Sequence, residues 1–461
     1  MKSAPRQSES SGGSGVWHKF HIGEHAFLFI VSSLVGVCTG VMAWLLKSAI
    51  NHLSAWFTAT VKAQGPDWWL LLLPVTGVLI VVALRQYFFP GPIGHGVRVI
   101  SRMIKKRETD LPAQVSYSPL ICTALTLGFG GSAGAEGPIA FSGAALASTV
   151  SRRLGITGRS AMIMLGCGAG AGIAAIFKAP IGGALFTLEV LRLGMGSFGV
   201  MVLFVTTLIA ALTATLLGGF SLDMVMSQTA SYDPHILPWA LLLGLFCGVY
   251  SIYYSYIMKL VEHWLEIMKN RWVRGAVSGV LVGCFLVLFP SLYGEGYPVM
   301  GHLLNGDFNA LTFGTFLDHL TLSPKLVLLV ATCVMLVKCF VTSLSYNGGG
   351  VTGEFAPTLF AGCFAGYVFA ASCNLWLGTH LPVSQFVLLG MAGVMSGAIR
   401  APLMAMFIVV EMSSAFTLLL PLAFTASLSF GVVRLFTSDS FFARAMDRNN
   451  GWFAKYLKKK L

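Results

Sequence analysis

Long apolar segments, separated by short polar ones, run along almost the whole chain. They include residues 27–46, 68–84, 198–217, 239–254 and 325–340. Several of these segments approach the roughly 20 residues that an α-helix needs to cross a bilayer. The pattern predicts an all-α polytopic membrane protein, and it disfavours the alternative of a soluble protein with buried helices.

A second group of apolar segments is short or interrupted by glycine and proline, at residues 138–150, 173–193 and 355–371. Interrupted helices are tolerated inside a membrane only where they are buried in protein or line a cavity. We therefore expect a bundle of many tilted and broken helices around a transport pathway, rather than a simple anchor.

Composition and charge agree with this class. Of the 461 residues, 56% are hydrophobic and only 10% are charged, against about 25% charged in an ordinary soluble protein. The net charge of +12 gives no indication of nucleic-acid binding, because the basic residues gather in short loops and tails, at 102–107, 152–159, 269–274 and 458–460. By the positive-inside rule, these segments and both termini are predicted to be cytoplasmic.

Two stretches of the chain echo each other. GAEGPIAFSG at residues 134–143 has nearly the outline of GEFAPTLFAG at 353–362, and FKAP followed by Glu189 matches IRAP followed by Glu411. The offsets are nearly equal, which indicates an internal duplication. Such repeats in membrane proteins commonly meet at a binding site near the midplane, often with inverted topology. We expect Glu189 and Glu411 to share a structural role, such as bonding backbone groups at helix ends.

The duplication suggests how the chain is divided. We predict a flexible N-terminal tail at 1–26, a first membrane repeat at 27–220 and a connecting segment at 221–235. A second membrane repeat at 236–445 and a basic C-terminal tail at 446–461 complete the division.

The pattern Gly-x-x-x-Pro before an apolar segment is a signal for the start of a helix. The first peptide NH groups of a helix lack internal partners and carry a partial positive charge. Several such ends that converge inside a bilayer could bind an anion without a full cation. Both echoed motifs supply such a start, and GPIGHGV at 91–97 is a third candidate.

Glu136 is the one carboxylate in the first of these motifs, where the second has Phe355. A charged side chain at membrane depth is costly and points to a functional site. When ionised, Glu136 could occupy the place of the anion, and when protonated it could swing away. Such a residue would couple anion passage to protons. The alternative is a glutamate that only caps its helix.

These motifs resemble those of the CLC family of chloride channels and chloride/proton exchangers. GAEGP is similar to the family's GREGP, GEFAP to its GxFxP, and GHGV lies where its GSGIP motif belongs. The resemblance implies an inverted-repeat bundle that forms a homodimer with one pore per subunit, in the inner (cytoplasmic) membrane of a prokaryote. It implies no enzyme and no cofactor, with chloride as the transported ligand. Only a short tail follows Phe442, so we expect no regulatory CBS pair.

The resemblance also assigns the site residues. Glu136 corresponds to the external gating glutamate, and Phe355 lines the anion site. The anion-binding set that it implies is Gly94, His95, Gly96, Ala135, Glu136, Gly137, Glu354, Phe355, Ala356 and Phe442. No metal site is expected.

Four positions depart from the family's pattern. His95 replaces the central serine, Ala135 the arginine before the gate, and Phe442 the central tyrosine. Many exchangers carry a proton-relaying glutamate where this chain has Val190, which cannot carry a proton. His95 could donate a ring NH or add charge at mild acidity, or it could simply be a packed histidine. Glu354 either bonds locally, away from the pore, or forms a second protonatable gate.

We therefore expect transmembrane chloride transport, passive and channel-like or weakly proton-coupled, gated by protonation of Glu136 in a lipid bilayer. The first alternative is a chloride/proton antiporter whose inner proton route uses His95 or water. A further alternative is an inverted-repeat transporter of another anion, such as fluoride.

Overall fold

The computed structural model describes residues 23–64, 69–91, 96–220, 224, 233–307 and 323–436, and these are almost wholly helical. The helices of the first half are α1 (Glu24–Gln64), α2 (Trp69–Ala83), α3 (Gly96–Lys106), α4 (Ser118–Gly128), α5 (Glu136–Arg153), α6 (Gly158–Phe177), α7 (Pro180–Leu185) and α8 (Ser197–Gly218). Those of the second half are α9 (Leu237–Glu266), α10 (Arg271–Leu288), α11 (Tyr297–Leu304), α12 (Pro324–Asn347), α13 (Phe355–Leu377), α14 (Val383–Ile399), α15 (Pro402–Ser413) and α16 (Leu419–Phe436). Short 3-10 or π turns are η2 (Leu84–Phe88), η3 (Ala113–Ser116), η4 (Phe186–Val190), η5 (Pro234–Ile236), η6 (Pro290–Leu292) and η8 (Phe416–Leu418). The predicted all-α class is confirmed.

The surface of the bundle is apolar. Leu208, Leu212 and Leu216 of α8 are 55%, 51% and 62% exposed, and their spacing of four places them on one face of the helix. An apolar surface of this kind is unfavourable in water and marks contact with a membrane or a partner. Within the described residues, nine helices are long and apolar enough to cross a bilayer. The chain is an integral membrane protein.

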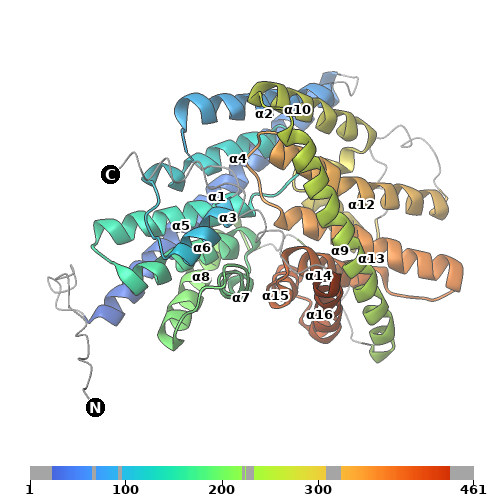
Figure 1. Ribbon diagram of the computed structural model, residues 1–461. Helices are drawn as coiled ribbons and strands as arrows, with labels where there is room; N and C mark the ends of the chain where they lie inside the picture. Colours follow the sequence, from blue (N-terminus) through green and yellow to red (C-terminus); the bar gives the residue numbers. More distant parts are fainter. Residues whose placement is uncertain are drawn as a thin grey trace, which may run out of the picture.

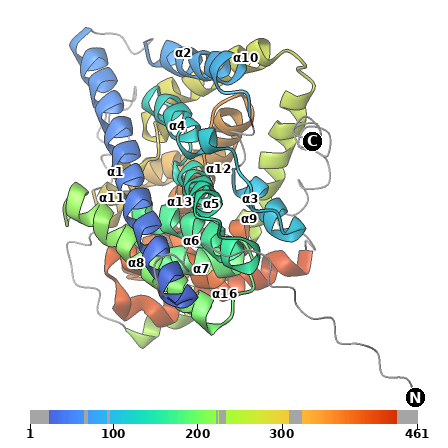
Figure 2. The same ribbon diagram turned by 90° about the vertical axis from the view of Figure 1, so that its left-hand side faces the viewer.

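The two halves of the chain lie side by side. In Figure 1 the helices from α3 to α8 occupy the left side and those from α12 to α16 the right side. The short helices α7 and α15 pack against each other between the two halves, and α2 of the first half packs against α10 of the second. Figure 2 shows the long helix α1 along the outside of the first half, where it packs against α8. The first residues of α5 and α13 are buried inside the bundle.

Equivalent glycines hold the central helices close together in each half. A Cβ atom on Gly143 of α5 would overlap the carbonyl oxygen of Gly168 in α6. In the second half, a Cβ atom on Gly362 of α13 would overlap the carbonyl oxygen of Gly390 in α14. The absence of side chains lets two backbones approach closely, as is common in membrane helix pairs.

The expectation of short or broken segments is confirmed at residues 173–193, since α6 ends at Phe177 and α7 begins at Pro180. Residues 138–150 lie within α5, an unbroken helix of 18 residues. Residues 355–371 instead belong to α13, an uninterrupted helix of 23 residues. Its glycines lie within the helix and let it pack closely on α14.

Carboxylates from each half cap a helix of the other. Glu411 of α15 accepts hydrogen bonds from the backbone NH groups of Ile181 and Gly182 at the start of α7, at 3.0 and 2.8 Å. Glu189 does the same for the second and third residues of α15, at 3.3 and 2.8 Å. These bonds satisfy NH groups that the first turn of a helix leaves without partners. The expected structural role of both glutamates is confirmed.

Candidate functional site

The two echoed motifs meet in the centre of the bundle. Gly134 and Gly353 pair as an antiparallel bridge, in which the NH of each donates to the carbonyl oxygen of the other at 3.0 and 2.5 Å. Helix α5 begins at Glu136 and α13 at Phe355, so both helices start directly after this bridge. No side chain caps either helix from its N-cap position. Two helix N-termini with their partial positive charges therefore lie side by side.

The side chain of Glu136 lies between these two helix starts. It is fully buried, and a Cβ atom on Gly134 would overlap its Oε2 atom, while one on Gly353 would come to 3.0 Å from it. The backbone NH groups of Glu136 and Ala356 face the carboxylate, and the hydroxyl of Tyr297 donates to Oε1 at 3.4 Å. The carboxylate thus occupies a position at which helix N-termini favour negative charge.

The other predicted residues of the two motifs surround this point. Gly137 packs against the backbone of Gly353, to which a Cβ atom would come within 3.3 Å. The NH of Ala135 donates to Oε1 of Glu295 at 3.1 Å, so a protein carboxylate engages this group. Phe355 is 1% exposed, and its ring meets that of Phe186 edge-on at 5.6 Å.

The third predicted motif is described only in part. Gly96 begins α3, and a Cβ atom there would overlap the side chain of Phe141 in α5. The start of α3 therefore lies against α5. Gly94, His95 and Phe442 lie outside the described residues.

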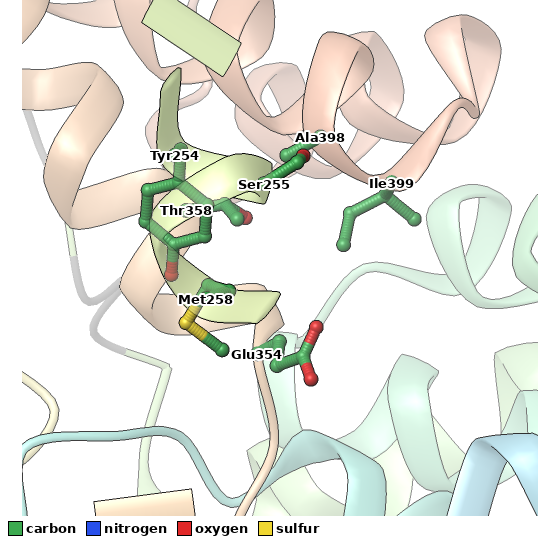
Figure 3. A pocket seen from close by; sticks show the side chains of 7 residues that line it. All are labelled: Tyr254, Ser255, Met258, Glu354, Thr358, Ala398 and Ile399. Carbon is green, nitrogen blue, oxygen red and sulfur yellow. The ribbon is translucent and has the colours of Figure 1, made fainter. Parts of the chain in front are cut away.

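Glu354 has local partners of its own. Its Oε1 atom lies 3.9 Å from a guanidinium nitrogen of Arg98 in α3, and Arg98 also contacts Glu262 of α9 at 3.3 Å. Glu354 borders a small cavity with room for about one water molecule, shown in Figure 3. The other lining residues come from α9, α13 and α14: Tyr254, Ser255, Met258, Thr358, Ala398 and Ile399.

Three residues near Glu136 had no place in the predicted site. Tyr297 is the first residue of α11, Glu295 lies two residues before it, and Lys338 lies in the middle of α12. A signal existed for Lys338, because it is a charged residue within the apolar segment 325–340. Glu295 lies in a polar turn, LYGEGYP, where a carboxylate is ordinary.

A polytopic helical protein with two buried helix starts around one carboxylate has the architecture of an ion-transport protein. The sequence matches the profile of the family described as "Voltage gated chloride channel" over residues 77–434, and the chain belongs to this family. The predicted CLC membership is confirmed.

Bacterial relatives match over most of the chain. It is 25% identical to a "Putative chloride channel protein ClcB-like" of Ralstonia nicotianae, over 92% of this chain and 97% of the relative. It is 24% identical to an "H(+)/Cl(-) exchange transporter ClcA" of Vibrio cholerae, over 87% of this chain and 84% of the relative.

Solved structures share the fold. A slow cyanobacterial Cl⁻/H⁺ antiporter matches with a TM-score of 0.78 and 22% identity, over 93% of this chain and 100% of that structure. A CLC-type fluoride/proton antiporter matches with a TM-score of 0.75 and 21% identity, over 90% and 97%. The CLC-like architecture expected from the sequence is confirmed.

Proposed function

We propose that this protein transports chloride or a similar small anion across a membrane, and that Glu136 is its protonatable gate. The observation that carries the proposal is the buried Glu136 carboxylate between the starts of α5 and α13. Membership of the voltage gated chloride channel family supports the choice of a small anion. Two relatives named for chloride transport point the same way.

The proposed gate works because the Glu136 carboxylate and a transported anion compete for the same position at the two helix starts. The ionised carboxylate of Glu136 is an anion on a tether, and it takes the place that backbone NH groups of both helix starts would offer to a free anion. Protonation removes its charge and with it most of the attraction to the helix ends. The side chain can then leave, and a transported anion can enter.

Substitution of the gate tests the proposal. Glu136→Gln keeps the shape of the side chain but removes its ability to ionise. In liposomes under a chloride gradient, we expect anion flux that no longer depends on pH and that equals or exceeds wild-type flux. Glu266→Gln at an exposed position of α9 is the matched control. Flux that keeps its wild-type pH dependence in Glu136→Gln would contradict the gate.

For the mode of transport, we favour passive or weakly coupled conduction. Val190 stands where many exchangers carry an inner proton-relaying glutamate, and its side chain cannot carry a proton. The test is uphill movement: a chloride gradient applied to liposomes should drive little or no proton uptake against a proton gradient. Sustained uphill proton movement at a fixed ratio would establish the exchanger instead.

A proton exchanger is the second candidate, and a specific cluster favours it. Glu354 and Glu262 are two carboxylates that lie on either side of Arg98, which keeps its own proton, and the side chain of Glu262 is 24% exposed. The two carboxylates, joined by water in the cavity beside Glu354, would offer an inner proton route that avoids Val190. Glu354→Gln should then abolish proton movement and leave anion flux. The name of the Vibrio cholerae relative agrees with this mode.

Selectivity and assembly belong to the same proposal. We expect chloride flux to exceed fluoride flux, and the reverse order would favour the fluoride alternative. We also expect a homodimer in the inner membrane with both termini cytoplasmic. Light scattering in detergent measures the oligomeric state. Protease access to each terminus in oriented vesicles shows on which side of the membrane the terminus lies.

A further inference from the structure

Lys338 is a fully buried lysine in a membrane-spanning helix. It lies in α12, and its Nζ atom donates to the Oγ of Ser132 at 2.9 Å and lies 4.3 Å from the ring centroid of Phe360. Neither a hydroxyl nor an aromatic ring neutralises a full positive charge. A buried charge at membrane depth is costly unless an opposite charge accompanies it.

Two carboxylates supply that opposite charge. Lys338 bonds to Ser132 and Glu295 to Ala135, so both reach the short segment that leads into Glu136. At this range Glu295 and Glu136 both act electrostatically on the ammonium of Lys338, and they also act on each other. Glu295 is 8% exposed and precedes Gly296, whose φ of +84° is the left-handed conformation that favours glycine. The turn thereby places the Glu295 carboxylate against the NH of Ala135, the residue before the gate.

Glu136, Glu295 and Lys338 form one cluster whose net charge is negative when all three groups are ionised. When all three are ionised, two negative charges share one positive charge in the buried interior. When either carboxylate takes up a proton, the cluster becomes neutral. Because charges interact strongly in such surroundings, the state of Glu136 depends on that of its two neighbours.

The same residues also hold the segment that leads into the gate. Lys338 binds Ser132 and Glu295 binds Ala135, so α12 and the turn before α11 fix the chain on both sides of Gly134. Ser345 of α12 adds a third contact, since its Oγ accepts from the NH of Ser132 at 3.0 Å.

Other polar groups complete the surroundings of Glu136. From α11, the hydroxyl of Tyr297 contacts it directly, and from α1, Lys47 lies 5.5 Å from the Tyr297 ring centroid. At the start of α13, Glu354 is engaged with Arg98 of α3. Lys338 and Glu295 are therefore the charged groups through which α12 and the α11 turn act on the gate.

We propose that Lys338 and Glu295 are positioning residues that set the pH at which the Glu136 gate opens, Lys338 by stabilising the ionised gate and Glu295 by opposing it. The role rests on the proposed gating function of Glu136. Neither residue needs to touch the transported anion.

The two charges predict shifts in opposite directions. Acid opens the gate, so flux rises as pH falls. Lys338→Met removes the charge that stabilises ionised Glu136, and the pH of half-maximal flux should rise by about one unit or more. Glu295→Gln removes a repulsive charge, and the half-maximal pH should fall by about as much. Lys338→Arg keeps the charge and should leave the half-maximal pH near that of the wild type.

The experiment measures chloride flux from liposomes between about pH 4 and pH 8. The proteins are the wild type, these three variants, the double variant and Glu136→Gln. The pH range covers the usual pKa values of carboxyl and histidine groups, about 4 to 6.5. The double variant Lys338→Met, Glu295→Gln removes both charges, and its half-maximal pH should lie between those of the single variants. If Lys338→Met fails to fold, Glu295→Gln decides alone, because it keeps Lys338 and its bond to Ser132.

The outcomes separate two kinds of failure. If Glu136→Gln leaves the pH dependence intact, the gate itself is refuted, and the role of Lys338 and Glu295 falls with it. If Glu136→Gln abolishes the pH dependence but Lys338→Met and Glu295→Gln keep the wild-type half-maximal pH, only the role of these two residues is refuted. Variants that lower thermal stability or maximal flux without moving the half-maximal pH would show a purely structural role.

Discussion

The cap that Glu411 places on α7 gives the clearest test of how the two halves are joined. Glu411→Ala removes both acceptors from the NH groups of Ile181 and Gly182, which now lie 3.0 and 2.8 Å from the carboxylate oxygens. The substitution leaves two NH groups at the start of a buried, short helix without their partner. We expect the variant to fold but to unfold more readily than the wild type.

The size of the effect follows from the bonds lost. A hydrogen bond to a charged group contributes about 1.5 to 3 kcal/mol, so two such bonds set an upper bound of about 6 kcal/mol. Glu411 is half-buried, and water that enters the vacated space would recover part of this loss. The expected loss in the free energy of unfolding is therefore about 2 to 4 kcal/mol.

The assay is unfolding in mixed micelles with increasing SDS, followed by tryptophan fluorescence. Glu411→Gln retains one acceptor oxygen and should lose about half as much, and Glu266→Ala at an exposed position should change little. Glu189→Ala should cost somewhat less than Glu411→Ala, because one of its two bonds is longer, at 3.3 Å. A loss below about 1.5 kcal/mol for Glu411→Ala, the lower end for one such bond, would refute the reasoning.

Three further predictions concern packing and the gate. Gly362→Ala should lower the free energy of unfolding by about 1 to 3 kcal/mol in the same assay, because its Cβ would overlap the Gly390 carbonyl oxygen. Gly431→Ala is the control: its Cβ would meet open space, so the variant should not be destabilised. Tyr297→Phe should raise the half-maximal pH of flux by less than about one unit, because a hydrogen bond of 3.4 Å is weak. His95→Ser should change anion selectivity or the response of flux to acid, and a variant unchanged in both would show that His95 serves packing.

Much of the fold could be predicted from local patterns. Apolar segment length gave the membrane class, and the Gly-x-x-x-Pro motifs placed the starts of α5 and α13 within one or two residues. Glycine was harder to interpret, since the same residue type can break a helix or let it pack closely. In α13 the glycines pack against α14. Whether a glycine plays this role depends on the helix that lies beside it, which the local sequence does not reveal.

The candidate site was predicted in part. Glu136 and Phe355 stand at the two helix starts where the motifs placed them. For Glu354, two interpretations were open, and the structure gives it Arg98 as a local partner. The proposed roles of these residues in transport remain predictions for the experiments above, and the division into two repeats also remains a prediction.

The sequence by itself determined that this protein is a helical membrane protein with two related helix starts and one carboxylate between apolar segments. Hydropathy, helix starts and the cost of a buried charge are properties of a few consecutive residues, so a short stretch reveals them. Only the tertiary structure brought Glu295 to Ala135 and Lys338 to Ser132, across 160 and 206 positions of the chain. Contacts at such separations leave no periodic pattern in the sequence, because they depend on how the two halves pack together.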